Sequence, residues 1–170
     1  MVDPALEQAL NDQLNRETYS SYLYLSISAH FEAAGFPGFA SWMRAQAEEE
    51  HLHAMKFFGF LNDRGGRVRL QAVAEPPVDF GTPLQAFEAS LEHERFITRS
   101  IEELYEQGDR STQAFLDWFI TEQVEEEKNV TQVVESLRLA ADSGPALLLL
   151  DREMGARQPA AASAGGGAGA

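Results

Sequence analysis

Cysteine is absent from the 170 residues, and basic residues are few: 13 lysines and arginines stand against 27 aspartates and glutamates. Without cysteine the chain has no disulfide framework, thiolate nucleophile, iron–sulfur cluster or cysteine-ligated zinc. The formal net charge of −14 argues against a nucleic-acid partner and against docking on an anionic membrane, because both need basic patches. The same acidity permits a cation as partner.

Long hydrophobic runs are also missing. The longest, Ala146–Leu150, is far too short to cross a bilayer. The N-terminus has neither a basic start nor an apolar core, so it predicts no signal peptide. We therefore expect no membrane segment and a cytoplasmic protein whose length suits one domain with a sizeable core.

Proline and glycine are scarce, with 7 and 13 residues, and long helical patterns fill the gaps between them. From Ala156 onward the composition is that of a flexible Ala/Gly-rich tail, which leaves residues 1–155 as the domain. The predicted helices are Pro4 to about Ala33, Phe39–Asp63, Pro83–Gln107, Ser111–Asp142 and a short fifth helix, Ala146–Met154.

Four long helices predict an all-α four-helix bundle. The turns that join the first helix to the second and the third to the fourth are short, so each pair forms an antiparallel hairpin. The link between the second and third helices, about residues 64–82, is long enough to run the length of the bundle. One long crossover is typical of ferritin-like bundles rather than of simple up-down bundles.

Acidic residues interrupt the core stripe of every long helix. Read at steps of three and four, each stripe is apolar at both ends and acidic near its middle. Burying several carboxylates close together is costly, because each loses its hydration and repels the others. A bound cation removes that cost. The acids on the four stripes are Glu17, Glu50, Glu94, Glu122 and Glu126.

The ligand types narrow the choice of cation. Glu50 and His53 form an E-x-x-H pair, which places a carboxylate and an imidazole on one helix face. Carboxylates with one imidazole inside a helix bundle suit a pair of iron or manganese ions. A calcium cage fits less well, because it draws on loop carbonyls. The remaining histidines and the tryptophans lie off the stripes and are interpreted as surface or packing residues: His30, His51, His93, Trp42 and Trp118.

Three ordered segments resemble the bacterial non-haem ferritins, within the ferritin-like di-iron family. The resemblance implies a ferroxidase that oxidises Fe²⁺ with O₂ and stores the ferric mineral inside a hollow homo-oligomeric shell of twenty-four subunits. It covers the chain up to about Gly155. The segments are Leu10–Tyr24 (LNDQLNRETYSSYLY), Ala47–Lys56 (AEEEHLHAMK) and Trp118–Lys128 (WFITEQVEEEK).

The resemblance also implies roles for individual residues. Glu17, Glu50 and His53 would hold a first iron ion, with Glu50 bridging to a second ion. Glu94 and Glu126 would complete the second site.

Further positions match the family outside these two sites. Gln123 would line the centre beside bound water or oxygen species, and Tyr24 would be a possible electron donor. The fifth helix would line the four-fold axes of the shell. A third iron site of the bacterial members would match Glu49, Glu122, Glu125 and Glu126.

Two differences separate the chain from bacterioferritins, so no haem is expected. His51 stands where those proteins carry a haem-ligating methionine, and the window Gln123–Glu126 lacks their second E-x-x-H motif.

Two alternative functions remain open at this point. One is a di-iron carboxylate oxidase that acts on an organic substrate; the other is a cage subunit that nucleates mineral without oxidising iron.

Overall fold

The structure, a computed structural model, describes residues 2–156, and every regular element in that range is a helix. The predicted all-α class is confirmed, and the predicted helix ends differ from the observed ones by one or two residues at most. The tail past Ala156 lies outside the described residues. The helices are α1 (Pro4–Ala34), α2 (Pro37–Asp63), α3 (Pro83–Gln107), α4 (Arg110–Ala140) and α5 (Gly144–Met154).

Local sequence signals explain where the long helices begin. The Asp3 side chain accepts hydrogen bonds in the first turn of α1, and Pro4 takes the first helical position. Thr82 and Gln85 form a capping box at the start of α3, and the Asp109 carboxylate caps α4. These side chains satisfy backbone N–H groups that a helix cannot pair internally.

The start of α2 is capped by another helix. Phe36, the residue directly before α2, accepts no hydrogen bond from the first turn with its side chain. Instead, Asp151 of α5 is buried there, and its Oδ1 accepts a hydrogen bond from the backbone nitrogen of Phe39 at 2.8 Å. The approach requires glycine at position 38, because a Cβ on Gly38 would lie 1.6 Å from the Asp151 carbonyl oxygen. Asp151 thus fixes α5 across one end of the bundle.

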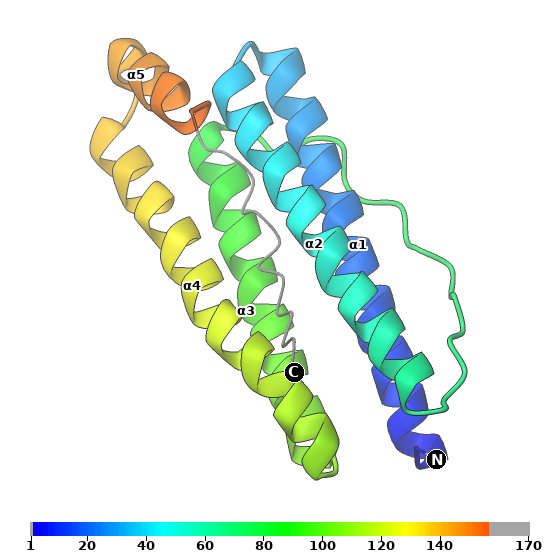
Figure 1. The fold of residues 1–170 in the computed structure, drawn as a ribbon. Coiled ribbons are helices and arrows are strands. Elements are labelled where there is room, and N and C mark those ends of the chain that lie inside the picture. Colours follow the sequence, from blue (N-terminus) through cyan, green and yellow to red (C-terminus); the bar gives the residue numbers. More distant parts are fainter. Residues whose placement is uncertain (1, 157–170) are drawn as a thin grey trace, which may run out of the picture.

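The four long helices form two antiparallel pairs with one crossover, as expected (Figure 1). α1 and α4 run in one direction, and α2 and α3 run in the other. The segment 64–82 returns along the outside of the bundle from the end of α2 to the start of α3. α5 lies over the end where α1 turns into α2.

Side chains of α1 hold the crossover against the bundle. Asn11 donates a hydrogen bond to the carbonyl of Arg67 and accepts one from the backbone nitrogen of Arg69, at 3.0 and 2.6 Å. One turn further along, Asn15 donates to the carbonyl of Ala72 at 3.1 Å. The segment therefore has a defined path although it contains no regular secondary structure.

The apolar core is divided into two clusters, and a buried polar layer lies between them. The cluster nearer α5 includes Phe31, Phe39 and Phe87, and the other includes Phe57 and Phe119. On every long helix most of the buried residues between the two clusters are polar or charged. The buried members of this layer are Glu17, Ser20, Glu49, Glu50, His53, Glu94, Gln123 and Glu126.

The predicted core face of α4 is wrong by about one residue at several positions. The stripe drawn from the sequence steps through Phe115, Glu122 and Val133, which are only half-buried. The buried positions are Leu116, Gln123 and Val134. Steps of three and four along a helix describe neighbouring faces equally well, and the packing of α4 on α3 decides between them. A similar shift occurs on α1 and α3, where Ser20 and Ile97 are buried and their neighbours Ser21 and Thr98 are half-buried.

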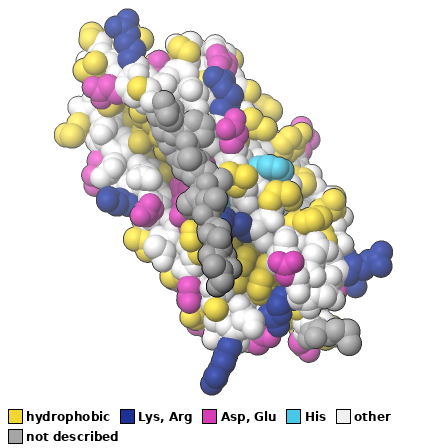
Figure 2. Space-filling view, in the orientation of Figure 1, with side chains coloured by type: hydrophobic (Ala, Val, Ile, Leu, Met, Phe, Trp, Pro, Cys, Tyr) yellow, Lys and Arg dark blue, Asp and Glu magenta, His cyan; other side chains and the backbone are white. Residues whose placement is uncertain are grey.

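The outer surfaces of α1 and α2 carry several exposed hydrophobic side chains. Figure 2 shows hydrophobic groups gathered on that side of the molecule. Within residues 2–156, no helix is long and apolar enough to cross a membrane. The exposed residues are Tyr22, Leu25, Leu52, Met55 and Phe58.

Candidate metal centre

The polar layer gathers glutamates from all four long helices and one histidine. Six of its side chains are at least 96% buried, although an unpaired carboxylate is among the groups least often found inside a protein. The sequence placed each of them at mid-helix, and the structure brings them to one level of the bundle. They are Glu17 on α1, Glu50 and His53 on α2, Glu94 on α3, and Gln123 and Glu126 on α4.

Glu17, Glu50 and His53 form a group whose ligand atoms lie within 4.8 Å of one another. His53 Nδ1 is 3.4 Å from Glu50 Oε2 and 3.9 Å from Glu17 Oε2. Two carboxylate oxygens and an imidazole nitrogen that converge in this way are suitable ligands for a borderline-hard divalent ion.

One oxygen in this group makes no hydrogen bond. Gln13 donates its amide N–H to Glu17 Oε1 at 2.7 Å, but Glu17 Oε2 is buried without a hydrogen-bond partner among the described residues. Buried polar atoms are nearly always paired, so such an orphan needs an explanation. A cation between Glu17, Glu50 and His53 would satisfy it, and the donor set therefore fits a metal ion.

Gln46 links two carboxylates that come from different helices. Its amide nitrogen donates to Glu50 Oε1 at 3.2 Å and to Glu126 Oε2 at 2.7 Å. Both Gln46 and Gln13 are fully buried. Neither glutamine was predicted from the sequence to be part of the site. Their spacing could have indicated this role from the sequence, because each glutamine stands four residues, about one helical turn, before a glutamate of the core stripe.

Glu94 is held from two sides. The Tyr24 hydroxyl donates to Glu94 Oε1, and the Gln123 amide nitrogen donates to Glu94 Oε2 at 3.2 Å. Burial, followed by the charge of Glu94, raises the pKa of Tyr24 well above its ordinary value, so the phenol keeps its proton. Tyr24 and Gln123, which the resemblance places beside the centre, thus both contact Glu94 directly.

Burial is also the main reason why the carboxyls of this layer hold their protons. It raises the pKa of Glu17, Glu50, Glu94 and Glu126 from 4.5 to about 8 each. The second cause is the charge of a neighbouring glutamate: Glu50 acts on Glu17 and Glu94, Glu126 acts on Glu50, and Glu94 acts on Glu126. Without a cation these groups cannot all ionise at neutral pH.

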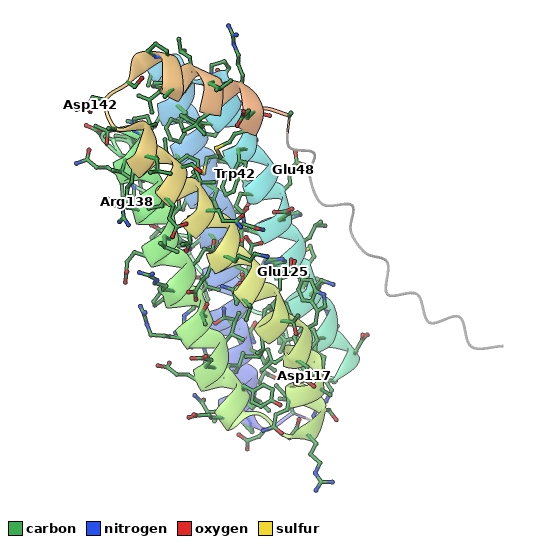
Figure 3. The ribbon with its side chains drawn as sticks, turned by 90° about the vertical axis from the view of Figure 1, so that its left-hand side faces the viewer. Trp42, Glu48, Asp117, Glu125, Arg138 and Asp142 are labelled. Atoms are coloured by element: carbon green, nitrogen blue, oxygen red, sulfur yellow. The ribbon has the colours of Figure 1, made fainter. Side chains whose placement is uncertain are left out.

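A second group of possible ligands lies beside the first. His53, Glu122 and Glu126 place one ligand atom each within 4.8 Å of one another, and Glu122 is half-buried. Glu49 is buried, and its charge raises the pKa of both Glu122 and Glu126. Of the four residues predicted for a third iron site, Glu122 and Glu126 lie in this group, and Glu49 and Glu125 are close enough for their charges to act on Glu122. Glu125 is exposed on α4 about midway along the bundle (Figure 3).

Aromatic rings enclose the imidazole of His53. Its ring centroid lies 5.3 Å from that of Trp118 and 5.8 Å from that of Phe119, both in edge-on contact. Trp118 in turn packs under the ammonium group of Lys56, 4.2 Å from the ring centroid. Trp118 therefore packs as expected, and it also limits how far His53 can turn.

His93 is a packing residue, as predicted, but it packs next to the site. Its ring lies edge-on to Tyr24, with centroids 6.1 Å apart, and its Nε2 is 2.7 Å from the Ser20 hydroxyl. Burial lowers the pKa of His93 to about 4. A neutral imidazole thus supports the tyrosine without adding charge to the layer.

Removing the amide of Gln46 should weaken metal binding without removing a ligand. In Gln46→Leu, Glu50 and Glu126 lose their shared hydrogen-bond donor, and losing such a ligand-orienting contact typically weakens metal binding by roughly 10- to 100-fold. Anaerobic calorimetric titration with Co²⁺ measures the affinity. Gln132→Leu, a change at an exposed position of α4, should bind like wild type. Equal affinity in wild type and Gln46→Leu would contradict the positioning role.

The geometry agrees with comparisons to known proteins. Residues 7–140 match the ferritin-like domain family, a range that contains every residue of the polar layer.

Individual ferritins are similar to nearly the whole chain. The bacterial non-heme ferritin of Bacteroides fragilis (strain 638R) is 38% identical over 161 residues, which are 92% of this chain and 100% of the relative. That of Staphylococcus aureus (strain USA300) is 37% identical over 92% of this chain and 97% of the relative. An open pore ferritin from the hyperthermophilic archaeon Archaeoglobus fulgidus superposes with a TM-score of 0.92 and 48% identity, covering 93% of this chain and all of that one. The chain therefore belongs to the ferritin family.

Proposed function

We propose that this ferritin-family chain is a ferroxidase that oxidises Fe²⁺ with O₂ and stores the ferric product inside a homo-oligomeric shell. The observation that carries the proposal is the polar layer itself. Carboxylates from four helices and one imidazole converge there, and the buried Glu17 Oε2 has no hydrogen-bond partner among the described residues. Iron is the substrate of this reaction, and its storage is the outcome.

Two iron positions follow from the arrangement of ligands. We assign Glu17, Glu50 and His53 to the first ion, and Glu50 with Glu94 and Glu126 to the second. The first assignment is supported by the convergence of its ligand atoms. The second is supported by the electrostatic coupling of Glu50 to both Glu94 and Glu126. Glu50 is common to both positions and would bridge them.

The surrounding residues would hold the ligands and move charge. Gln123 and Tyr24 each donate a hydrogen bond to Glu94, so both would orient that carboxylate toward the second ion. Two ferrous ions give up two electrons, which with two protons reduce one O₂ to hydrogen peroxide. Tyr24 is an oxidisable side chain hydrogen-bonded to Glu94 of the layer, and we assign it as a possible further electron donor.

A third iron position is proposed at the edge of the layer. The group formed by His53, Glu122 and Glu126 lies beside the first two positions, and the charge of Glu49 acts on two of its members. With Glu125, these acids would form a site through which iron ions pass to or from the oxidation centre.

The shell is the part of the proposal that involves other copies of the chain. The exposed hydrophobic residues on α1 and α2, Leu25 and Leu52 among them, would be covered by neighbouring subunits, since large apolar patches are uncommon on monomers. We propose twenty-four subunits, by analogy with the family, and a cytoplasmic location. The alternative of an oxidase for an organic substrate is not favoured, because the relatives over the whole chain are ferritins.

Adding Fe²⁺ to the purified protein in air tests the proposal. The expected result is ferric absorbance that rises, and O₂ that is consumed, well above the rates of a protein-free control. Size-exclusion chromatography and electron microscopy should then show a large hollow particle with an iron-dense core. Iron oxidation no faster than the control would contradict the ferroxidase, and a monomer or dimer would contradict storage in a shell.

A further inference from the structure

A small cavity between α3 and α4 ends beside the polar layer. Its volume is about 250 Å³, and its walls include the apolar side chains of Ile101, Ile120 and Val124, with the carboxylates of Glu102 and Glu127 also in the lining. Thr98 and Gln123 close its inner end. Val124, at the outer end, is 68% exposed, whereas Gln123 is buried. The cavity therefore leads from the surface of the subunit to a buried amide.

A single side chain separates this cavity from the proposed iron ligands. The Gln123 amide nitrogen lies 3.2 Å from Glu94 Oε2 and 3.3 Å from the Thr98 hydroxyl oxygen. A molecule in the cavity thus touches a residue that is hydrogen-bonded to the acid cluster. None of the residues that close the cavity is assigned as an iron ligand in the two central positions.

Three of the polar residues that line the cavity, Thr98, Gln123 and Glu127, are already paired, and the fourth, Glu102, is an exposed carboxylate. Thr98 accepts the hydrogen bond of Gln123 and donates its own to Glu127 Oε1 at 2.6 Å. The other oxygen of Glu127 forms an ion pair with Arg95 at 3.9 Å. Since Arg95 offsets its charge and Thr98 occupies one oxygen, Glu127 is poorly suited as an ion ligand here. Apolar walls with satisfied polar groups at the end favour a small non-polar guest.

We propose that this cavity is the binding pocket and access route for O₂ on its way to the iron centre. The inference rests on the proposed ferroxidase function, which requires O₂ to reach a buried site. O₂ is small and non-polar, so it needs apolar walls and no hydrogen-bond partner. Rotation of the Gln123 amide away from Thr98 would open the last contact between the pocket and the carboxylate layer.

Closing the outer end of the cavity tests the route. Val124→Trp adds a large ring at an exposed position, where it should not disturb folding, and Leu139→Trp adds the same ring at another exposed position of α4, where Leu139 is 89% exposed. Each protein is loaded anaerobically with two Fe²⁺ per subunit and mixed with buffers of increasing O₂. The oxidation rate at limiting O₂ should fall several-fold in Val124→Trp only, and the rate at saturating O₂ and the anaerobic Fe²⁺ affinity should stay unchanged.

Xenon pressurisation of crystals gives a readout that does not depend on iron oxidation. We expect xenon density between Ile101 and Ile120 in wild type and Leu139→Trp, and none in Val124→Trp. An unchanged dependence on O₂, or weaker Fe²⁺ binding as the only effect, would overturn the O₂ route; the second result would make the cavity a cation path. Absence of xenon from wild type would overturn the gas pocket, whereas an inactive wild type that binds xenon would count against the ferroxidase alone.

Discussion

Replacing Glu50 by glutamine should abolish rapid iron oxidation while leaving the fold intact. Glu50 is in contact with His53, accepts a hydrogen bond from Gln46 and is coupled to Glu94 and Glu126, so it is the proposed bridge between both iron positions. Losing a contact that merely orients a ligand costs roughly 10- to 100-fold, and we expect the loss of the bridging ligand to cost at least about 100-fold. Stopped-flow absorbance of ferric iron at two Fe²⁺ per subunit measures the rate.

The glutamate run around Glu50 offers a matched control. Glu48 is two residues away on α2 but is exposed (Figure 3), so Glu48→Gln removes the same charge without touching the polar layer. It should oxidise iron at the wild-type rate. Glutamine keeps the volume of the buried side chain, and thermal unfolding of both variants checks that the bundle is preserved. A Glu50→Gln protein as fast as wild type would contradict the assigned centre, and equal losses in both variants would point to overall charge instead.

The second large effect is a dependence of the protein's stability on pH, which divalent metal should reverse. The carboxyls of Glu17, Glu50, Glu94 and Glu126 have a folded-state pKa of about 8 against 4.5 in the unfolded chain. Between these values the folded protein holds protons that the unfolded chain has released. The free energy of unfolding of the metal-free protein should therefore fall as pH rises from about 4.5 to 8, because the unfolded chain releases protons over this range that the folded protein retains.

Divalent metal should reverse this trend, because it binds the ionised carboxylates and displaces their protons. We expect Co²⁺ to raise the unfolding temperature more at pH 7.5 than at pH 5.5. We also expect protons to be released on binding, measured by calorimetry in buffers of different ionisation enthalpy.

Glu50→Gln provides the control for this titration. On metal binding it should release fewer protons than wild type. Its metal-free stability should also fall less steeply as pH rises, since one carboxyl with a raised pKa is gone. Metal-free stability that is constant from pH 5 to 8, or metal binding without proton release in wild type, would show that these carboxyls are already ionised in the folded protein.

Much of the fold could be predicted because its signals are local. Asp3 before Pro4 and Thr82 before Pro83 mark helix starts through hydrogen bonds that span only a few residues, and a helix-period pattern persists between them. The long segment 64–82 between two short-turn hairpins was enough to predict the crossover. The start of α2 was less predictable, because Asp151 caps it from a helix more than a hundred residues away in sequence.

The buried acids could be predicted because burial of acid is unusual in itself. Glu17, Glu50, Glu94 and Glu126 lie among apolar stripe neighbours, and that contrast is visible in the sequence alone. What supports them was not visible. Gln46 joins Glu50 to Glu126 across two helices, and a glutamine on a core stripe gives no sign of what it will contact.

By itself, the sequence determined which helices form, how they connect and which acids lie at their midpoints, since helix periodicity, capping and turn length act over short distances. Only the tertiary structure decided which carboxylate oxygens lie close to one another. The face of α4 depended on its packing against α3, which buried Gln123 and left Glu122 half-exposed. The same packing formed the cavity that ends at Gln123, and the approach of α1 to α2 left the Glu17 Oε2 atom without a hydrogen-bond partner among the described residues. These features exist only where several helices approach one another, because each is made of atoms that are distant in sequence.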